Sequence, residues 1–285
     1  MVIVDTHAHA IAGDQYRYPI SPIDGQQSDW SKEHPVSAEG LIEHMDRAGV
    51  DKTVLVQASS VYGYDNSYTL DSVAARPDRF VGVCCIDATA PDTPDVLRYM
   101  VEERGVSGVR LFTQNDPSWI DQERAKPFWR EAARLDVPVN VALHRSGLPN
   151  LASAAEQNRD VRILLDHLAN SLVDDGPPYE QARTLFDLAE HPNIWLKFST
   201  YNLHDAEQGG STVEQFFGQL VRTFGADRIM WGSNFPASWG SGSGDPYIEL
   251  VDLSRNELAF LSDADLRLLL GESALSVYPA LQKRP

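Results

Sequence analysis

The stretch MVIVDTHAHA (residues 1–10) places two histidines directly after a run of apolar, mostly β-branched residues. The apolar run favours a strand over residues 1–5, and side chains on a strand alternate between its two faces. His7 and His9 therefore point the same way, roughly 6–7 Å apart along the chain. Two imidazoles aimed at one place predict a functional site, provided that other parts of the chain bring further polar groups there.

Seven more short apolar runs follow this one and are separated by segments with helical spacing. Several are apolar almost without interruption, which is typical of parallel strands covered on both faces. In residues 37–50, an apolar stripe lies between an N-cap serine and a terminating glycine, as in an amphipathic helix. The seven runs are KTVLVQ (52–57), RFVGVCCID (79–87), SGVRLF (107–112), VPVNVALH (137–144), VRILLDH (161–167), NIWLKFS (193–199) and RIMWGSN (228–234).

Eight strands that alternate with helices predict an α/β fold, a single (β/α)8 TIM barrel that occupies residues 1–285. The competing fold is a doubly wound open sheet. The chain has neither a G-x-G-x-x-G motif after a strand nor a P-loop, which are frequent marks of that fold. Long loops are expected on the active face of the barrel at residues 10–36, 200–212 and 235–247.

Composition and charge limit the classes of function. The formal net charge of −17 argues against a nucleic-acid partner, which requires a basic face. No apolar run approaches 18 residues and no signal peptide is evident, so no membrane partner is expected. Cys84 and Cys85 lie in an apolar run and are expected to be reduced core residues. The sequence therefore favours a cytoplasmic protein, and a homo-oligomer is left open.

Polar residues gather at the ends of the predicted strands, where barrel enzymes place their chemistry. They are His7 and His9 (strand one), Arg110 (four), His144 and Arg145 (five), Asp166 and His167 (six), Lys197 (seven) and Asn234 (eight). Imidazoles from three strands can hold a divalent metal ion, which would polarise a carbonyl and activate water. This arrangement favours hydrolysis or decarboxylation.

Four motifs in this order resemble the amidohydrolase superfamily. They are H-x-H at residues 7–9, the histidine after the fifth strand, LDH (165–167) and GSNFP (232–236). Within the superfamily, the chain is similar to a branch of small barrels that contains 2-pyrone-4,6-dicarboxylate lactonase, related lactone hydrolases and non-oxidative decarboxylases. The resemblance extends over essentially the whole chain.

This resemblance implies a metal site and leaves its occupancy open. His7, His9 and His144 match the positions of the family's metal ligands, and zinc or manganese would suit them. Lactonases of this branch also work without a metal. A metal-binding hydrolase and a metal-independent hydrolase are therefore both compatible with the sequence.

The resemblance also implies catalytic roles for four residues. His7 and His9 would polarise the substrate carbonyl, directly or through a metal, and His167 matches a catalytic histidine. Asn234 falls where most members have an aspartate. Because an amide cannot take a proton from water, the general base would be His167, Asp166 or a metal-bound hydroxide.

Positive side chains at the strand ends favour a small anionic organic substrate. Arginine pairs bidentately with carboxylate, and Arg110 matches a carboxylate-binding position of the lactonase. The predicted substrate-binding residues are Arg110, Arg145, Ser59, Tyr62, Lys197 and Trp239.

The function predicted from the sequence is opening of a small, carboxylated lactone by water attack on a polarised carbonyl. Three alternatives stay open. The first is a zinc-dependent non-oxidative decarboxylase of the same superfamily. The second is a hydrolase of a cyclic amide or imide. The third is a non-catalytic binding protein that retains the pocket.

Overall fold

A computed structural model of the chain describes residues 1–113, 116–239, 242 and 244–282. Its strands form one parallel sheet of eight strands in chain order. The strands are β1 (Val4–Ala8), β2 (Lys52–Val56), β3 (Phe80–Cys85), β4 (Gly108–Phe112), β5 (Val139–Ala142), β6 (Ile163–Leu165), β7 (Ile194–Phe198) and β8 (Ile229–Trp231). The segment after β8 returns to β1, because Asn234 N donates to His7 O at 2.7 Å and His9 N donates to Phe235 O at 2.8 Å. The predicted (β/α)8 barrel is confirmed.

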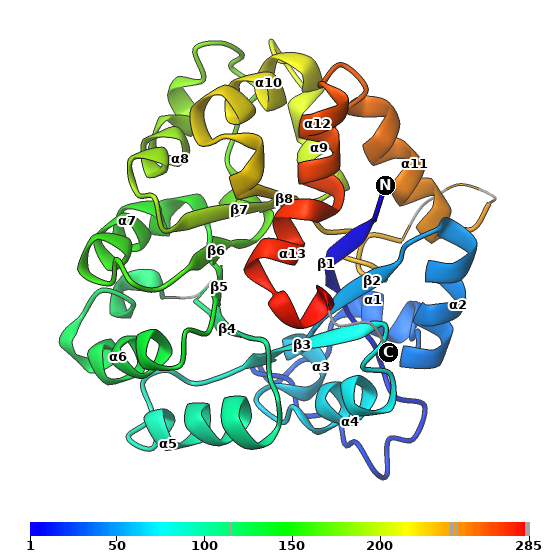
Figure 1. The fold of residues 1–285 in the computed structure, drawn as a ribbon, viewed down its shortest axis with the longest axis vertical. Coiled ribbons are helices and arrows are strands. Elements are labelled where there is room, and N and C mark those ends of the chain that lie inside the picture. The colour runs from blue at the N-terminus through cyan, green and yellow to red at the C-terminus, as the bar shows by residue number, and fades with distance from the viewer. Residues whose placement is uncertain (114–115, 240–241, 243, 283–285) are drawn as a thin grey trace.

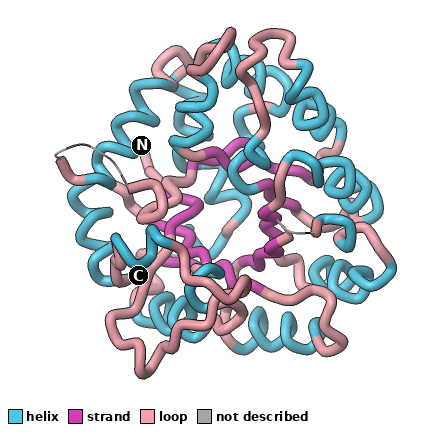
Figure 2. Tube along the Cα trace, turned by 180° about the vertical axis from the view of Figure 1, so that it is seen from behind, coloured by secondary structure: helices cyan, strands magenta, loops and turns pink. Residues whose placement is uncertain are grey.

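Helices follow the strands and surround them, as the ring of strands inside the helices shows in Figure 2. The helix predicted within residues 37–50 is present as α2, with Ser37 capping Gly40 N and Gly49 in the left-handed conformation at its end. The helices are α1 (Asp29–Glu33), α2 (Ala38–Ala48), α3 (Ser59–Tyr62), α4 (Ser67–Ala75), α5 (Thr93–Arg98), α6 (Lys126–Arg134), α7 (Leu148–Gln157), α8 (Arg183–Asp187), α9 (Thr200–Ala206), α10 (Val213–Phe224), α11 (Pro246–Glu257), α12 (Asp263–Arg267) and α13 (Ser273–Val277).

All eight strands differ in their bounds from the predicted runs, and the differences at the first and the fifth affect the site. The first strand was expected at residues 1–5 but lies at Val4–Ala8, so that His7 is part of β1. The fifth was expected at residues 137–144 but ends at Ala142. His144 is the N-cap of a short 3-10 turn, Arg145–Gly147, outside the strand.

The far end of the barrel interior is closed by the C-terminal segment. Figure 1 shows α13 lying across the ring of strands. Val277 and Tyr278 pack into a buried cluster with inward valines from the first strands, among them Val4, Val54 and Val81. With this end filled by apolar side chains, the carboxyl ends of the strands are the open face of the barrel.

One predicted loop is partly helical. Residues 200–212 were expected to be a loop, but Thr200–Ala206 form α9. A capping box begins this helix, in which Ser199 and Asn202 each bind the other's backbone N–H. Residues 10–36 contain only the short helix α1, and α11 begins within 235–247, of which residues 240, 241 and 243 lie outside the described residues.

Across the described ranges, no helix combines the length and the apolar character needed to cross a bilayer.

Candidate active site

A cavity of about 340 Å³ opens at the carboxyl ends of the strands. Barrel enzymes bind their substrates at this end. Its lining combines imidazoles, one guanidinium, hydroxyls and amides with a few apolar side chains. The residues are His9, Ser28, Trp30, Ala58, Ser59, Ser60, Arg110, Phe112, His167, Asn170, Tyr201, Asn234 and Ala237.

Three imidazoles from two strand ends lie together here: His9 and His167 line the cavity, and the buried His7 ring contacts both. The ring centroid of His7 is 5.0 Å from that of His9 and 4.5 Å from that of His167. His9 Nδ1 lies 2.8 Å from Val56 O, so this nitrogen carries the proton and donates it, because a carbonyl can only accept. Nε2 of His9 therefore has a free lone pair. Trp30 stacks on the His9 ring with centroids 5.4 Å apart.

Burial keeps these imidazoles neutral. Desolvation by burial, together with the charge of Arg110, lowers the pKa of His9 to about 3. Burial also lowers the pKa of His167 to about 4, although the Asp166 charge opposes the shift. Desolvation by burial also holds the pKa of His7 well below its usual value. At neutral pH each ring can therefore donate one hydrogen bond and accept one.

A buried group of charges lies beneath the imidazoles. Arg110 Nε donates to Asp166 Oδ2 at 2.8 Å, and Lys197 Nζ lies 3.4 Å from Asp166 Oδ1. Burial by itself would raise the pKa of Asp166, but Lys197 and the other positive partners outweigh it and hold the pKa well below its usual value. Asp166 is therefore an ionised carboxylate held by two cations, and it does not line the cavity where a substrate would bind.

The turn that carries His167 has an unusual backbone. Four consecutive residues, His167 to Asn170, adopt positive φ angles of 52°, 50°, 54° and 49°. Left-handed geometry costs roughly 1–2 kcal/mol per non-glycine residue. Two hydrogen bonds hold the turn in place. Asn202 Nδ2 donates to His167 O at 3.0 Å, and Ser171 Oγ donates to Leu168 O at 2.8 Å. Strain of this kind is concentrated at functional sites.

Asn234 also has a positive φ angle, 57°, and its side chain lines the cavity. Its backbone joins the end of β8 to β1, as described above. The structure thus puts a neutral amide beside the histidines, where it can orient a substrate but cannot accept a proton from water.

Four predicted substrate-binding residues do not line this cavity. Tyr62 is buried, and its hydroxyl accepts a hydrogen bond from Ala12 N at 2.7 Å. Trp239 stacks on His34 with ring centroids 4.1 Å apart. Arg145 is exposed, and Lys197 is buried below the imidazoles with 1% of its side chain exposed. Ser59 and Arg110, in contrast, line the cavity as predicted.

The structure does not bring His144 together with His7 and His9. The His144 side chain is exposed, because β5 ends two residues before it. Throughout residues 1–113, 116–239, 242 and 244–282, no three His, Cys, Asp or Glu side chains form a group that could hold a metal ion. In addition, His7 Nδ1 faces the Lys197 amine at 3.4 Å. The residues present therefore do not fit a metal site.

Several residues that the sequence analysis did not select contribute to the site. Asn140 accepts a hydrogen bond from Lys197 Nζ at 2.8 Å, and Trp30 covers His9. Asp5 accepts bonds from Ser233 Oγ at 2.5 Å and from Tyr247 OH at 2.7 Å, beside the backbone of His7. Asp5 and Asn140 are single polar residues within apolar strand sequences. This interruption of the apolar pattern could have identified them as candidate site residues.

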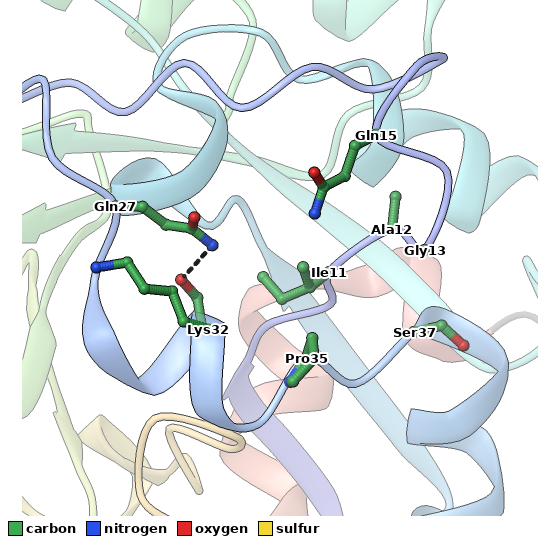
Figure 3. A pocket seen from close by; sticks show the side chains of 9 residues that line it. Ile11, Ala12, Gly13, Gln15, Gln27, Lys32, Pro35 and Ser37 are labelled. Carbon is green, nitrogen blue, oxygen red and sulfur yellow. Dashed lines mark hydrogen bonds between the residues drawn. The ribbon is translucent and has the colours of Figure 1, made fainter.

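A second hollow of about 440 Å³ lies within the loop of residues 10–36. Gln15 and Gln27 face it from two stretches of this loop in Figure 3, where Gln27 Nε2 donates to Ser31 Oγ at 3.0 Å. Lys32 is the sole ionisable side chain among its described lining residues. Because this hollow has no imidazole or carboxylate, we place the chemistry in the first cavity.

The sequence profile of the amidohydrolase family matches residues 4–280. The chain is 27% identical to L-fucono-1,5-lactonase of Burkholderia ambifaria over 82% of its own length and 80% of the relative's. It is also 27% identical to 4-sulfomuconolactone hydrolase of Hydrogenophaga intermedia, over 82% and 74%. A γ-resorcylate decarboxylase of Rhodococcus jostii is 37% identical over 70% and 75%. The chain therefore belongs to the amidohydrolase family.

Solved structures support the fold. A protein of Pseudomonas putida, provisionally assigned as a 2-pyrone-4,6-dicarboxylic acid hydrolase, superposes with a TM-score of 0.79 at 21% identity, over 98% of both chains. An amidohydrolase of Burkholderia multivorans that contains bound zinc superposes with a TM-score of 0.76 at 19% identity, over 98% and 99%. A divalent metal thus occurs among proteins with this fold.

Proposed function

We propose that this member of the amidohydrolase family hydrolyses a small lactone by direct attack of water on the ring carbonyl. The observation that carries the proposal is the cluster of three neutral imidazoles, two of which, His9 and His167, line a polar cavity. Such a cluster supplies both a proton acceptor and hydrogen-bond donors without a metal. The activities of the relatives from B. ambifaria and H. intermedia, which both act on lactones, support the same substrate class.

His9 is the proposed proton acceptor. Its Nδ1–H donates to Val56 O, so the lone pair of Nε2 is available to take a proton as water attacks the carbonyl carbon. The new C–O bond produces a tetrahedral intermediate. When the ring C–O bond breaks, the leaving oxygen recovers the proton from His9, and the product is a hydroxy acid. The low pKa of His9 keeps the ring neutral and ready in the free enzyme.

His7 and His167 are proposed to polarise the carbonyl. The developing oxyanion is stabilised by donors that are already in place and need not reorganise. The left-handed turn fixes the position of His167, and Asn234, which lines the same cavity, orients the substrate. In this proposal, no step requires Asp166 to accept a proton.

The lining of the cavity favours a lactone with one carboxylate at most and several hydroxyl groups. Arg110 is the sole cation among the described lining residues, and one guanidinium matches one carboxylate. The remaining polar groups are neutral hydroxyls and amides, such as Ser59, Ser60 and Asn170. These groups suit ring hydroxyls, which need both donors and acceptors.

A decarboxylase is the second candidate, because the relative from R. jostii has the higher sequence identity. The zinc-dependent form of that activity requires a set of metal ligands. The described residues do not provide such a set. We therefore rank lactone hydrolysis first.

The test is a substrate panel with matched variants. Release of acid from 1,5- and 1,4-lactones of sugar acids and from muconolactones is followed with a pH indicator, and loss of dihydroxybenzoates is followed by absorbance. His9→Gln and His167→Ala are expected to lower kcat by at least about 100-fold on the hydrolysed lactone. His204→Ala, which removes an exposed histidine, serves as the control. Decarboxylation without lactone hydrolysis, or tight binding without any product, would refute the proposal.

A further inference from the structure

We propose that Lys197 is a positioning residue that fixes the proton of His7 on Nε2, so that His7 presents an N–H donor to the substrate carbonyl. The role given to His7 rests on the proposed lactone hydrolysis, whereas the position of its proton does not. A continuous series of buried hydrogen bonds connects a backbone carbonyl to this imidazole.

The series begins at Val109. Its carbonyl oxygen can only accept, so the Asn140 atom that lies 3.2 Å from it must be the amide nitrogen. This contact fixes the orientation of the Asn140 side chain. Asn140 Oδ1 then points into the barrel as an acceptor and receives a hydrogen bond from Tyr278 OH at 3.0 Å.

Lys197 is the next member of the series. Its Nζ lies 2.8 Å from Asn140 Oδ1, 3.4 Å from Asp166 Oδ1 and 3.4 Å from His7 Nδ1. An ammonium group has N–H donors only, so Asn140 Oδ1 and His7 Nδ1 each accept a hydrogen bond from it, and Asp166 Oδ1 is its ion-pair partner. Because Asn140 and Asp166 present only oxygen acceptors to it, Lys197 acts as a donor throughout.

His7 Nδ1 must therefore accept. The alternative places the ring proton on Nδ1, where it would face an N–H of the ammonium. The other neighbour of Nδ1, Asp166 Oδ1, lies 3.5 Å away and forms no hydrogen bond with it, whereas Lys197 Nζ does. Since a neutral imidazole carries one N–H, the proton is on Nε2.

His7 Nε2 is buried and makes no hydrogen bond to any described residue. Leaving a buried donor unpaired costs about 1–3 kcal/mol. The His7 ring lies between His9 and His167, both of which line the cavity. A carbonyl oxygen bound over these rings would satisfy the unpaired N–H, and the bond would strengthen as the oxygen becomes an oxyanion.

The first experiment measures the tautomer in the wild-type protein. Two-bond ¹⁵N–¹H NMR spectra of the intact protein, labelled at histidine nitrogens, distinguish the two tautomers of each ring. The His7 signals are identified by their absence in His7→Gln. We expect the Nε2–H tautomer for His7 and the Nδ1–H tautomer for His9. The Nδ1–H tautomer at His7 in the wild-type protein would overturn the proposal.

The second experiment separates positioning from structure. Lys197→Met keeps the apolar length of the side chain and removes the donor, so the His7 proton is expected to move to Nδ1, towards Asp166. On the hydrolysed lactone, kcat should fall about 100-fold or more, the loss seen when one oxyanion donor is removed, with KM changed less than about 3-fold. Lys197→Gln, which retains an N–H donor, should recover part of kcat. Tyr278→Phe is the matched control, since it removes a different donor to Asn140.

The outcomes distinguish this proposal from the proposed function. A His7 proton that stays on Nε2 in Lys197→Met would overturn the positioning role, as would equal losses of kcat in Lys197→Met and Tyr278→Phe. If the wild-type tautomer is Nε2–H and shifts in Lys197→Met but no lactone is hydrolysed, the positioning role stands and the lactonase proposal fails.

Discussion

Replacing Asp166 with asparagine tests the buried charges beneath the site. The carboxylate is fully buried and holds Arg110 through a 2.8 Å hydrogen bond and Lys197 at 3.4 Å. The two cations have side chains that are only 7% and 1% exposed. Asparagine keeps the shape and one oxygen acceptor, so that the substitution removes little besides the charge.

The expected effect is large because two cations would stay buried without their anion. Removing one partner of a buried ion pair costs about 3–5 kcal/mol, most of which is the cost of the charge left behind. We therefore expect Asp166→Asn to lower the free energy of unfolding by about this amount. In Asp166→Asn combined with Lys197→Met, one uncompensated cation is removed, and the loss should be smaller than the sum of the single losses by about 1–3 kcal/mol.

Urea unfolding at pH 7, followed by tryptophan fluorescence and circular dichroism, measures both quantities. Asp29→Asn is the control, because Asp29 pairs with Lys32 at 3.1 Å with both side chains more than half exposed. Such a surface pair is worth less than about 1 kcal/mol. A loss in Asp166→Asn as small as the control, or strict additivity with Lys197→Met, would refute this account of the buried charges.

Four further predictions concern activity and the pH dependence of stability. Because the pKa values of His9 and His167 are about 3 and about 4, kcat/KM should stay nearly level from pH 7 to about pH 5 and fall only towards pH 4; a fall centred near pH 6.5 would contradict their burial. Below about pH 6.5 the unfolded chain binds protons at these histidines while the folded chain does not. The free energy of unfolding should therefore decrease as the pH falls from about 6.5 towards 4. Urea denaturation at several pH values measures this decrease. Dialysis against a chelator should leave kcat unchanged, with elemental analysis before and after; loss of activity that returns with zinc or manganese would contradict the reading of the ligand set. Arg145→Ala should change KM by less than about 2-fold, because the side chain is exposed and does not line the cavity. A 10-fold increase in KM would show that Arg145 contacts the substrate after all.

The arrangement of elements could be predicted from the sequence because it depends on local patterns. Apolar runs of strand length separated by amphipathic helices have few ways to bury all their faces, and the barrel is one of them. The H-x-H motif was equally informative. Alternation on a strand puts His7 and His9 on one face wherever the strand begins, and the two rings lie 5.0 Å apart although β1 starts three residues later than predicted.

What only the tertiary structure decided is where each strand stops and which groups meet inside the barrel. His144 would face inward with Asn140 if β5 continued, but the strand ends at Ala142 and the histidine turns outward. Likewise, the sequence left the directions of Asp166 and Lys197 open, and the fold turns both into the barrel, where they contact each other. A strand end is set by hydrogen bonds to neighbouring strands and by the turn that follows. These contacts join residues far apart in the chain, so no local pattern records them.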